Sequence, residues 1–118
     1  MKRVLIIDDS EMILNLTKRA LSAAGYDVTT LTDAAGFDPS KGKEPDLILV
    51  DINMPQFYGD DIVTYFRAEW PIKAPIYLFS NVPEEELQKR AEGCGADGYI
   101  SKDWGLERLV EEVQRILG

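Results

Sequence analysis

The chain has 118 residues, of which 45% are hydrophobic and 29% are charged, which is the size and composition of one folded domain. Its net charge of -8 argues against a surface for nucleic acid, and no apolar run approaches the roughly 20 residues that a membrane span needs. A single cysteine allows no disulfide within the chain, which is typical of a cytoplasmic protein, and the lack of histidine excludes a Ser-His-Asp triad and histidine-bound metals.

Five short segments predict β-strands. In chain order they are residues 3–7, 27–31, 47–50, 76–79 and 98–101. The first, third and fourth are continuous apolar runs rather than alternating ones, as expected for strands of a parallel sheet that is covered on both faces.

Amphipathic patterns between these segments predict helices. The expected ranges are residues 11–24, 60–70, 82–93 and 106–117. Gly25 stands where the first helix needs a C-terminal cap, and Pro71 ends the second. The segment 32–45 is rich in glycine and proline, so only a short, frayed or displaced helix is expected there.

Three of these helices have a clear apolar face that is expected to pack on the sheet. The face residues are Ile13, Leu16, Thr17, Ala20 and Ala24 in the first, Ile62, Tyr65, Phe66 and Trp70 in the second, and Leu106, Leu109, Val110, Val113, Ile116 and Leu117 in the last. Strands that alternate with helices through short connections predict a single three-layer α/β sandwich, with a five-stranded parallel sheet between two layers of helices.

Polar residues stand at the carboxyl ends of four predicted strands. They are Asp8 and Asp9, Asp51, Ser80 and Lys102. One polar residue after an apolar run only marks where a strand reaches the surface, but sites in open parallel sheets form at this edge. Four such strand ends together predict a functional site.

Three carboxylates at one edge repel one another and need a cation. Oxygen ligands without histidine or thiolate suit a hard ion, and Mg2+ is the expected one. Asp9, Asp51 and the backbone carbonyl of Asn53 could bind it directly, with Asp8 acting through water. A free coordination position would accept a phosphoryl oxygen, so the pattern predicts Asp51 as a nucleophile toward phosphorus and Lys102 as a partner of the phosphoryl group.

The motifs "IIDDS", "LILVDINMPQFYG", "IYLFSN" and "GADGYISK" resemble, in this order, those of the receiver domains of two-component response regulators. The resemblance covers essentially the whole chain. It implies a flavodoxin-like (βα)5 fold with strand order 2-1-3-4-5, and a single receiver domain over residues 1–118 with no output module in this chain.

The resemblance also implies roles for individual residues. Asp51 would be the phosphoacceptor, assisted by Lys102, and Ser80 and Tyr99 would form the switch. The Mg2+ ligands would be Asp8, Asp9, Asp51 and Asn53. A half-buried Tyr99 that only packs in its strand is the alternative to a moving switch residue.

The implied partners are a histidine kinase or histidine phosphotransfer protein as donor, and a downstream protein bound by the surface of the last two helices and the last strand. No nucleic acid or membrane partner is expected, and the chain would be a monomer or weak dimer. Phe57 and Tyr58, beside Asp51, would be either a docking patch or lids on the core.

Two positions depart from the family pattern. Asp103 follows Lys102 where the family usually has proline, and Val82 is apolar at a position that affects hydrolysis of the phosphoryl group. They motivate an alternative, a receiver-fold interaction module that acts without phosphorylation. A haloacid-dehalogenase-type phosphatase is the third hypothesis, but it needs an acid two residues after the nucleophile, where this chain has Asn53.

Overall fold

The computed structural model describes residues 1–33, 44–53, 59–69 and 72–118. The strands are β1 (Arg3–Ile7), β2 (Asp27–Leu31), β3 (Leu47–Val50), β4 (Ile76–Ser80) and β5 (Gly98–Ser101). The α-helices within these ranges are α1 (Glu11–Ala23), α2 (Gly59–Glu69), α3 (Glu84–Cys94) and α4 (Leu106–Leu117), and a 3-10 turn, η2, covers Lys102–Trp104. The predicted strands and the four stronger helices are therefore confirmed. The weak helix expected within 32–45 and the helix end at Trp70 and Pro71 fall mostly outside the described residues.

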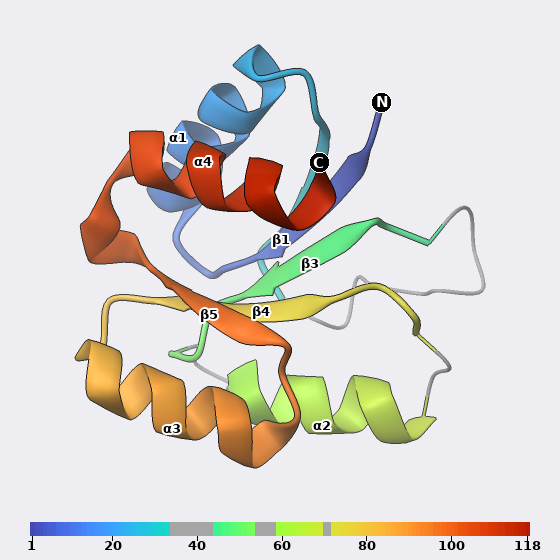
Figure 1. Cartoon of the computed structure of the whole chain (residues 1–118), viewed down its shortest axis with the longest axis vertical. Coiled ribbons are helices and arrows are strands. Elements are labelled where there is room, and N and C mark those ends of the chain that lie inside the picture. Colours follow the sequence, from blue (N-terminus) through green and yellow to red (C-terminus); the bar gives the residue numbers. More distant parts are fainter. Residues whose placement is uncertain (34–43, 54–58, 70–71) are drawn as a thin grey trace.

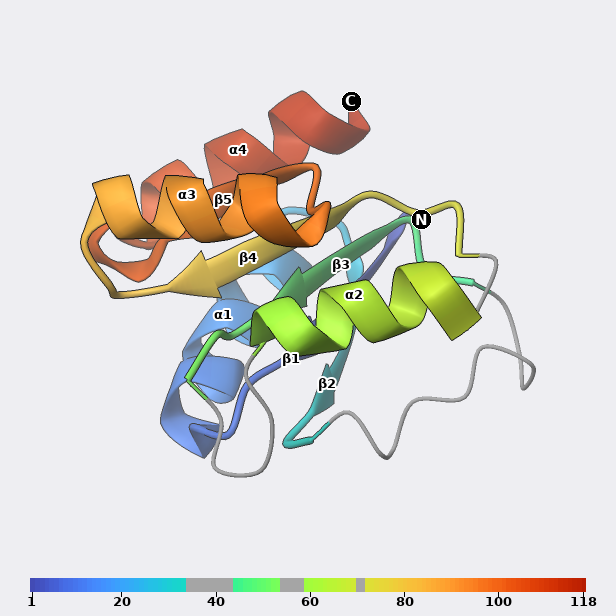
Figure 2. The ribbon, with the colours of Figure 1, turned by 90° about the horizontal axis from the view of Figure 1, so that it is seen from below.

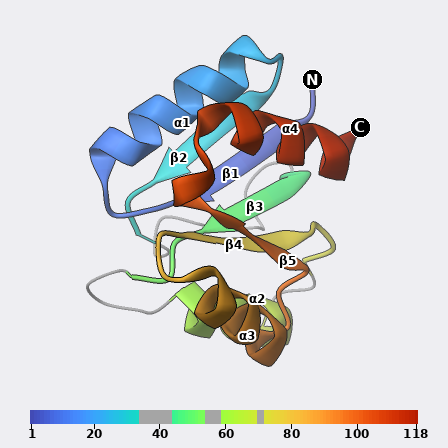
Figure 3. The ribbon, with the colours of Figure 1, turned by 60° about the vertical axis from the view of Figure 1, so that its left-hand side comes forward.

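All five strands run parallel in the order β2-β1-β3-β4-β5, which confirms the predicted topology. The sheet forms the middle layer, with α1 and α4 on one face and α2 and α3 on the other (Figure 1). Figure 2 shows α2 and α3 alongside each other on their face, and Figure 3 shows α1 next to α4 on the opposite one. None of the described helices is long and apolar enough to cross a membrane.

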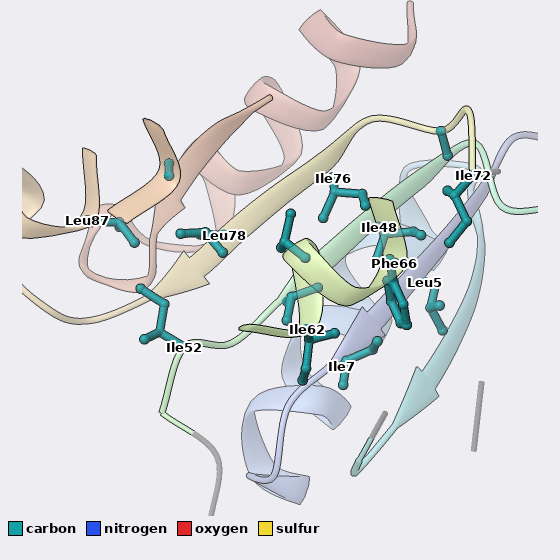
Figure 4. Packing of buried hydrophobic residues seen from close by; sticks show 14 residues of the cluster. Leu5, Ile7, Ile48, Ile52, Ile62, Phe66, Ile72, Ile76, Leu78 and Leu87 are labelled. Carbon is teal, nitrogen blue, oxygen red and sulfur yellow. The ribbon is translucent and has the colours of Figure 1, made fainter. Parts of the chain in front are cut away.

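Alternation along the strands divides the core into two clusters, one on each face of the sheet. On β1, Leu5 and Ile7 face α2 and α3, whereas Val4 and Ile6 face α1 and α4. Successive side chains of a strand point to opposite faces, so an entirely apolar strand supplies both cores. Figure 4 shows the first cluster, in which Ile62 and Phe66 of α2 and Leu87 of α3 pack with the strand residues labelled there.

Three residues that were predicted to face the core are exposed instead. Leu16 is 42% exposed, Tyr65 53% and Leu106 41%. On α1 the buried positions are Leu14, Thr17 and Leu21, so Leu16 lies on nearly the opposite side of the helix. On α2, Tyr65 is two residues after the buried Val63 and so points to nearly the opposite side of the helix. Leu106 is the first residue of α4 and precedes the turn that packs on the sheet.

Candidate functional site

Strand register places Asp8 and Asp51 next to each other. Ile7 pairs with Val50, the last residue of β3, so the next residues after both strands leave the sheet at the same level. The Asp51 amide donates a hydrogen bond to the Ile7 carbonyl at 2.9 Å, and the Asp8 amide donates to the Leu31 carbonyl at 3.0 Å. These backbone bonds hold both carboxylates at the carboxyl edge of the sheet.

The structure brings the three predicted carboxylates together. One oxygen each of Asp8, Asp9 and Asp51 lies within 4.8 Å of the other two. Asp8 and Asp51 are buried, whereas Asp9 is exposed. Asp8 is oriented by the Ser10 amide, which donates to Oδ1 at 2.9 Å. Of these three acids, Asp9 is therefore the one that faces solvent.

Lys102 reaches into the same cluster. Its Nζ lies 2.6 Å from Asp8 Oδ2 and 3.5 Å from Asp51 Oδ1, and its side chain is only 14% exposed. It extends from η2, where the Ser101 hydroxyl accepts a hydrogen bond from the Asp103 amide at 3.1 Å. The Phe79 ring lies below the ammonium, 5.4 Å from Nζ to the ring centroid. One cation thus neutralises part of a buried pair of acids.

Burial raises the pKa of Asp51 to about 6 from an ordinary value of 3.8, and the charges of Asp8 and Asp9 act in the same direction. The Lys102 ammonium and the hydrogen bond from the Asn53 amide, 3.4 Å from Oδ1, lower it in part. The surroundings of Asp51 thus disfavour its charged form, and further positive charge beside it would lower its pKa toward the ordinary value.

The donor set fits a hard divalent cation. Asp8 Oδ2 is buried and makes no hydrogen bond of good geometry with the described residues, so the Lys102 ammonium alone compensates its charge. All candidate ligands are oxygens, which Mg2+ prefers. Asn53 is exposed beside Asp51, where its backbone carbonyl can complete the set with Asp9.

The predicted switch residues lie on β4 and β5. Ser80 is fully buried, and its hydroxyl accepts a hydrogen bond from the Val82 amide at 3.4 Å. Tyr99 is half-buried, and its hydroxyl donates to Glu84 Oε1 at 3.0 Å. Nothing in the sequence indicated the Glu84 contact, because it joins the start of α3 to the next strand, β5, 15 residues further along the chain. The preference of Lys102 for Asp8 was not predicted either.

The two positions that depart from the family pattern lie outside the cluster of Asp8, Asp9 and Asp51. Asp103 is exposed, and its amide, which a proline would lack, forms the bond to Ser101. No peptide bond in the described ranges is cis. Val82 is half-buried against the core cluster on the α2 and α3 face. Met54, Pro55, Phe57 and Tyr58 lie outside the described residues, so the docking hypothesis for the last two is not addressed.

Comparison with known proteins shows the family of the chain. The response regulator receiver domain family matches residues 4–114. The chain belongs to this family. Receiver domains are signalling switches rather than enzymes in the usual sense, and they bind Mg2+ at an acidic pocket of the kind that Asp8, Asp9 and Asp51 form here.

Similar receivers occur both alone and within longer proteins. The nisin biosynthesis regulatory protein NisR of Lactococcus lactis subsp. lactis is 36% identical over 121 residues, which cover 95% of this chain but 48% of NisR. The chain thus spans about half the length of that relative. The polar-differentiation response regulator DivK of Brucella ovis is 26% identical over 119 residues, covering 99% of this chain and 97% of DivK.

Solved receiver structures share the whole fold. The Vibrio cholerae chemotaxis protein CheY4 is 31% identical, with a TM-score of 0.88 and coverage of 99% of both chains. A CheY-like receiver domain protein from Methanospirillum hungatei is 28% identical, with a TM-score of 0.85 and coverage of 99% of this chain and 94% of that one.

Proposed function

We propose that this receiver accepts a phosphoryl group on Asp51. The observation that carries the proposal is a buried carboxylate whose pKa is raised to about 6, with an ammonium 3.5 Å away and two further acids beside it. A structural role does not require three acids around one lysine, because a buried carboxylate that serves only the fold is destabilising.

In this reaction an oxygen of ionised Asp51 attacks the donor phosphorus. A P–O bond to Asp51 forms while the bond from phosphorus to the donor's nitrogen or oxygen breaks, and the leaving group keeps the electron pair and takes up a proton. Lys102 neutralises the charge of the transferred group, and the Ser80 hydroxyl donates to one of its oxygens. Asp8, Asp9, Asp51 and the backbone carbonyl of Asn53 would hold Mg2+, which when bound would supply positive charge for the phosphoryl oxygens.

The donor would be a phosphohistidine of a histidine kinase or phosphotransfer protein. A downstream protein would bind the surface formed by α3, β5 and α4, which adjoins both Ser80 and Lys102 along the chain. A monomer or weak dimer suffices for this role.

The test is incubation with acetyl phosphate and Mg2+, followed by intact-mass spectrometry. Wild-type protein should gain the mass of one phosphoryl group, and EDTA should prevent the gain. Asp51→Asn should gain nothing, whereas Asp61→Asn, which changes an exposed acid of α2, should react like wild type. An unmodified wild-type protein at low and high Mg2+ would contradict the proposal.

The two alternative functions have less support than phosphorylation of Asp51. The interaction module without phosphorylation was motivated by Asp103 and Val82, yet Lys102 still reaches both Asp8 and Asp51. It would be supported if Asp51→Asn left partner binding unchanged. The phosphatase lacks its general acid, since Asn53 carries an amide that cannot donate a proton as an acid. Turnover of p-nitrophenyl phosphate would revive that hypothesis.

A further inference from the structure

Tyr99 lies at the edge of the sheet in contact with two other elements. β5 is an edge strand that runs between α3 and α4 (Figure 1). The Tyr99 hydroxyl donates to Glu84 Oε1, in the first turn of α3, at 3.0 Å. The Tyr99 ring also lies 5.9 Å from the Trp104 ring, centroid to centroid, with 49° between the ring planes. Tyr99 thus contacts a carboxylate through its hydroxyl and an indole through its ring.

Both contacts of Tyr99 come from segments that begin in the acidic site. Glu84 follows Ser80 after a connection of only Asn81, Val82 and Pro83. Trp104 is the last residue of η2, which begins with Lys102. The two residues that would bind the phosphoryl group are therefore joined by short, stiff segments to the two residues that hold Tyr99.

The connection from Ser80 to Glu84 has little freedom to absorb a movement. Val82 donates its amide to the Ser80 hydroxyl and packs against the core cluster on the α2 and α3 face. Pro83 has a fixed φ, observed at -52°, and directly precedes α3 without a side-chain cap on the helix. If the Ser80 hydroxyl turned to another partner, the 3.4 Å contact with the Val82 amide would be lost at the connection that leads into α3.

The Glu84 contact is a hydrogen bond between a phenol donor and a charged acceptor. Burial and the bond to Glu84 raise the pKa of Tyr99 above its usual value, so the phenol keeps its proton at neutral pH. Arg108, from α4, lies over the Trp104 ring with Cζ 3.7 Å from the centroid and keeps the indole in place. The aromatic pair therefore has a defined resting arrangement.

We propose that Glu84 is a positioning residue that couples Ser80 to Tyr99. In the resting protein its carboxylate holds Tyr99 beside Trp104, and this hydrogen bond breaks when Ser80 turns toward a phosphoryl group on Asp51. The inference rests on the proposed phosphorylation of Asp51, and it assigns a role to Glu84 that neither the sequence nor the family resemblance indicated. The state of the acidic site then reaches the surface of α3, β5 and α4 through one side-chain contact.

Loss of the contact should shift the resting protein toward its switched form. One hydrogen bond to a charged but exposed group changes a two-state equilibrium by roughly fivefold. We therefore expect Glu84→Ala to react with acetyl phosphate roughly fivefold faster than wild type. Glu84→Gln keeps an oxygen acceptor and should stay close to wild type. Tyr99→Phe, which removes the donor, should match Glu84→Ala.

The experiment records Trp104 fluorescence in a Trp70→Phe background, in which Trp104 is the remaining tryptophan of the chain's two. Emission is measured before and after acetyl phosphate and Mg2+, and intact mass confirms the modification in each sample. The variants are Glu84→Ala, Glu84→Gln, Tyr99→Phe and the Glu84→Ala/Tyr99→Phe pair. Glu85→Ala removes the same charge from the same turn of α3 and serves as the matched control.

The expected result has two parts. Unphosphorylated Glu84→Ala should already show part of the emission change that phosphorylation causes in wild type, and the double variant should add nothing to either single variant. If every variant is phosphorylated normally but the emission changes of Glu84→Ala and Tyr99→Phe add in the double variant, this inference alone is overturned. The same holds if Glu84→Ala cannot be distinguished from Glu85→Ala. Absence of the phosphoryl mass in every sample would overturn the proposed function as well.

Discussion

Asp51 holds a negative charge where the surrounding protein disfavours it. Its side chain is 6% exposed, and burial together with Asp8 and Asp9 outweighs the attraction of Lys102, so the pKa of Asp51 is raised. An acid with a raised pKa makes the folded protein less stable once it ionises. A buried acid of this kind at a strand end is consistent with the proposed nucleophile, and it is unfavourable for the stability of the fold.

Replacing Asp51 should therefore stabilise the protein in a pH-dependent way. The pKa of Asp51 is about 6 in the folded state against 3.8 in the unfolded state, so the destabilisation is complete above pH 6 and absent below 3.8. In EDTA, Asp51→Asn should raise the free energy of unfolding by up to about 3 kcal/mol at pH 8 and by about half of that at pH 5.

Urea denaturation at the two pH values measures this difference. Asp61→Asn changes an exposed acid and should show no comparable gain. An Asp51→Asn protein that is less stable than wild type at pH 8 would show that the Lys102 ion pair outweighs the cost of burial.

At the level of elements, the fold could be predicted from four of the five strands, because β1, β3, β4 and β5 each end in a polar residue at the same edge and three of them are continuous apolar runs. The helices were less certain. On α1, more than one apolar stripe can be drawn through Met12, Ile13, Leu14 and Leu16. Contact with the sheet determines that the buried stripe is the one through Leu14. The same ambiguity of phase explains the wrong prediction for Tyr65 on α2.

The acidic site could be assembled from sequence because parallel strands deliver their ends to one edge. Its finer contacts could not be predicted. Lys102 Nζ is nearer to Asp8 than to Asp51 by less than 1 Å, a difference too small for any sequence pattern to specify. The bond between Glu84 and Tyr99 depends on where α3 starts relative to β5, which no local pattern specifies.

Packing between β4 and β5 gives a prediction at the element scale. A Cβ on Gly98 would lie 2.7 Å from Tyr77 Cε2, on the neighbouring strand. Gly98→Ala forces the Tyr77 ring aside and should lower the free energy of unfolding by about 1–2 kcal/mol. Chemical denaturation measures the loss.

Two further variants test the cause of that loss. Tyr77→Leu should reduce the penalty of Gly98→Ala, because the clashing ring atoms are gone. Gly93→Ala meets no atom within 4 Å on helix α3 and should be neutral or stabilising by up to about 1 kcal/mol. A Gly98→Ala penalty that persists in full without the ring would show that backbone conformation, rather than Tyr77, requires glycine.

The whole molecule is acidic as well as its site. The chain has 21 acidic and 13 basic residues, which give the net charge of -8. Any added salt screens this general repulsion. A divalent ion bound at the cluster of Asp8, Asp9 and Asp51 would instead act through these residues, so the two effects would differ in which residues they require.

Mg2+ should consequently stabilise the protein beyond the effect of ionic strength. Binding to the folded state alone adds about 2.7 kcal/mol to the free energy of unfolding at a free concentration of 100 times Kd. Urea unfolding in MgCl2 is compared with unfolding in NaCl of equal ionic strength. Asp9→Asn should lose the specific part, since Asp9 is an exposed member of the cluster, and Asp61→Asn should retain it. Equal stabilisation by the two salts would mean that the carboxylates are screened but bind no ion, and the charge that the phosphoryl transfer needs would then have to come from Lys102 alone.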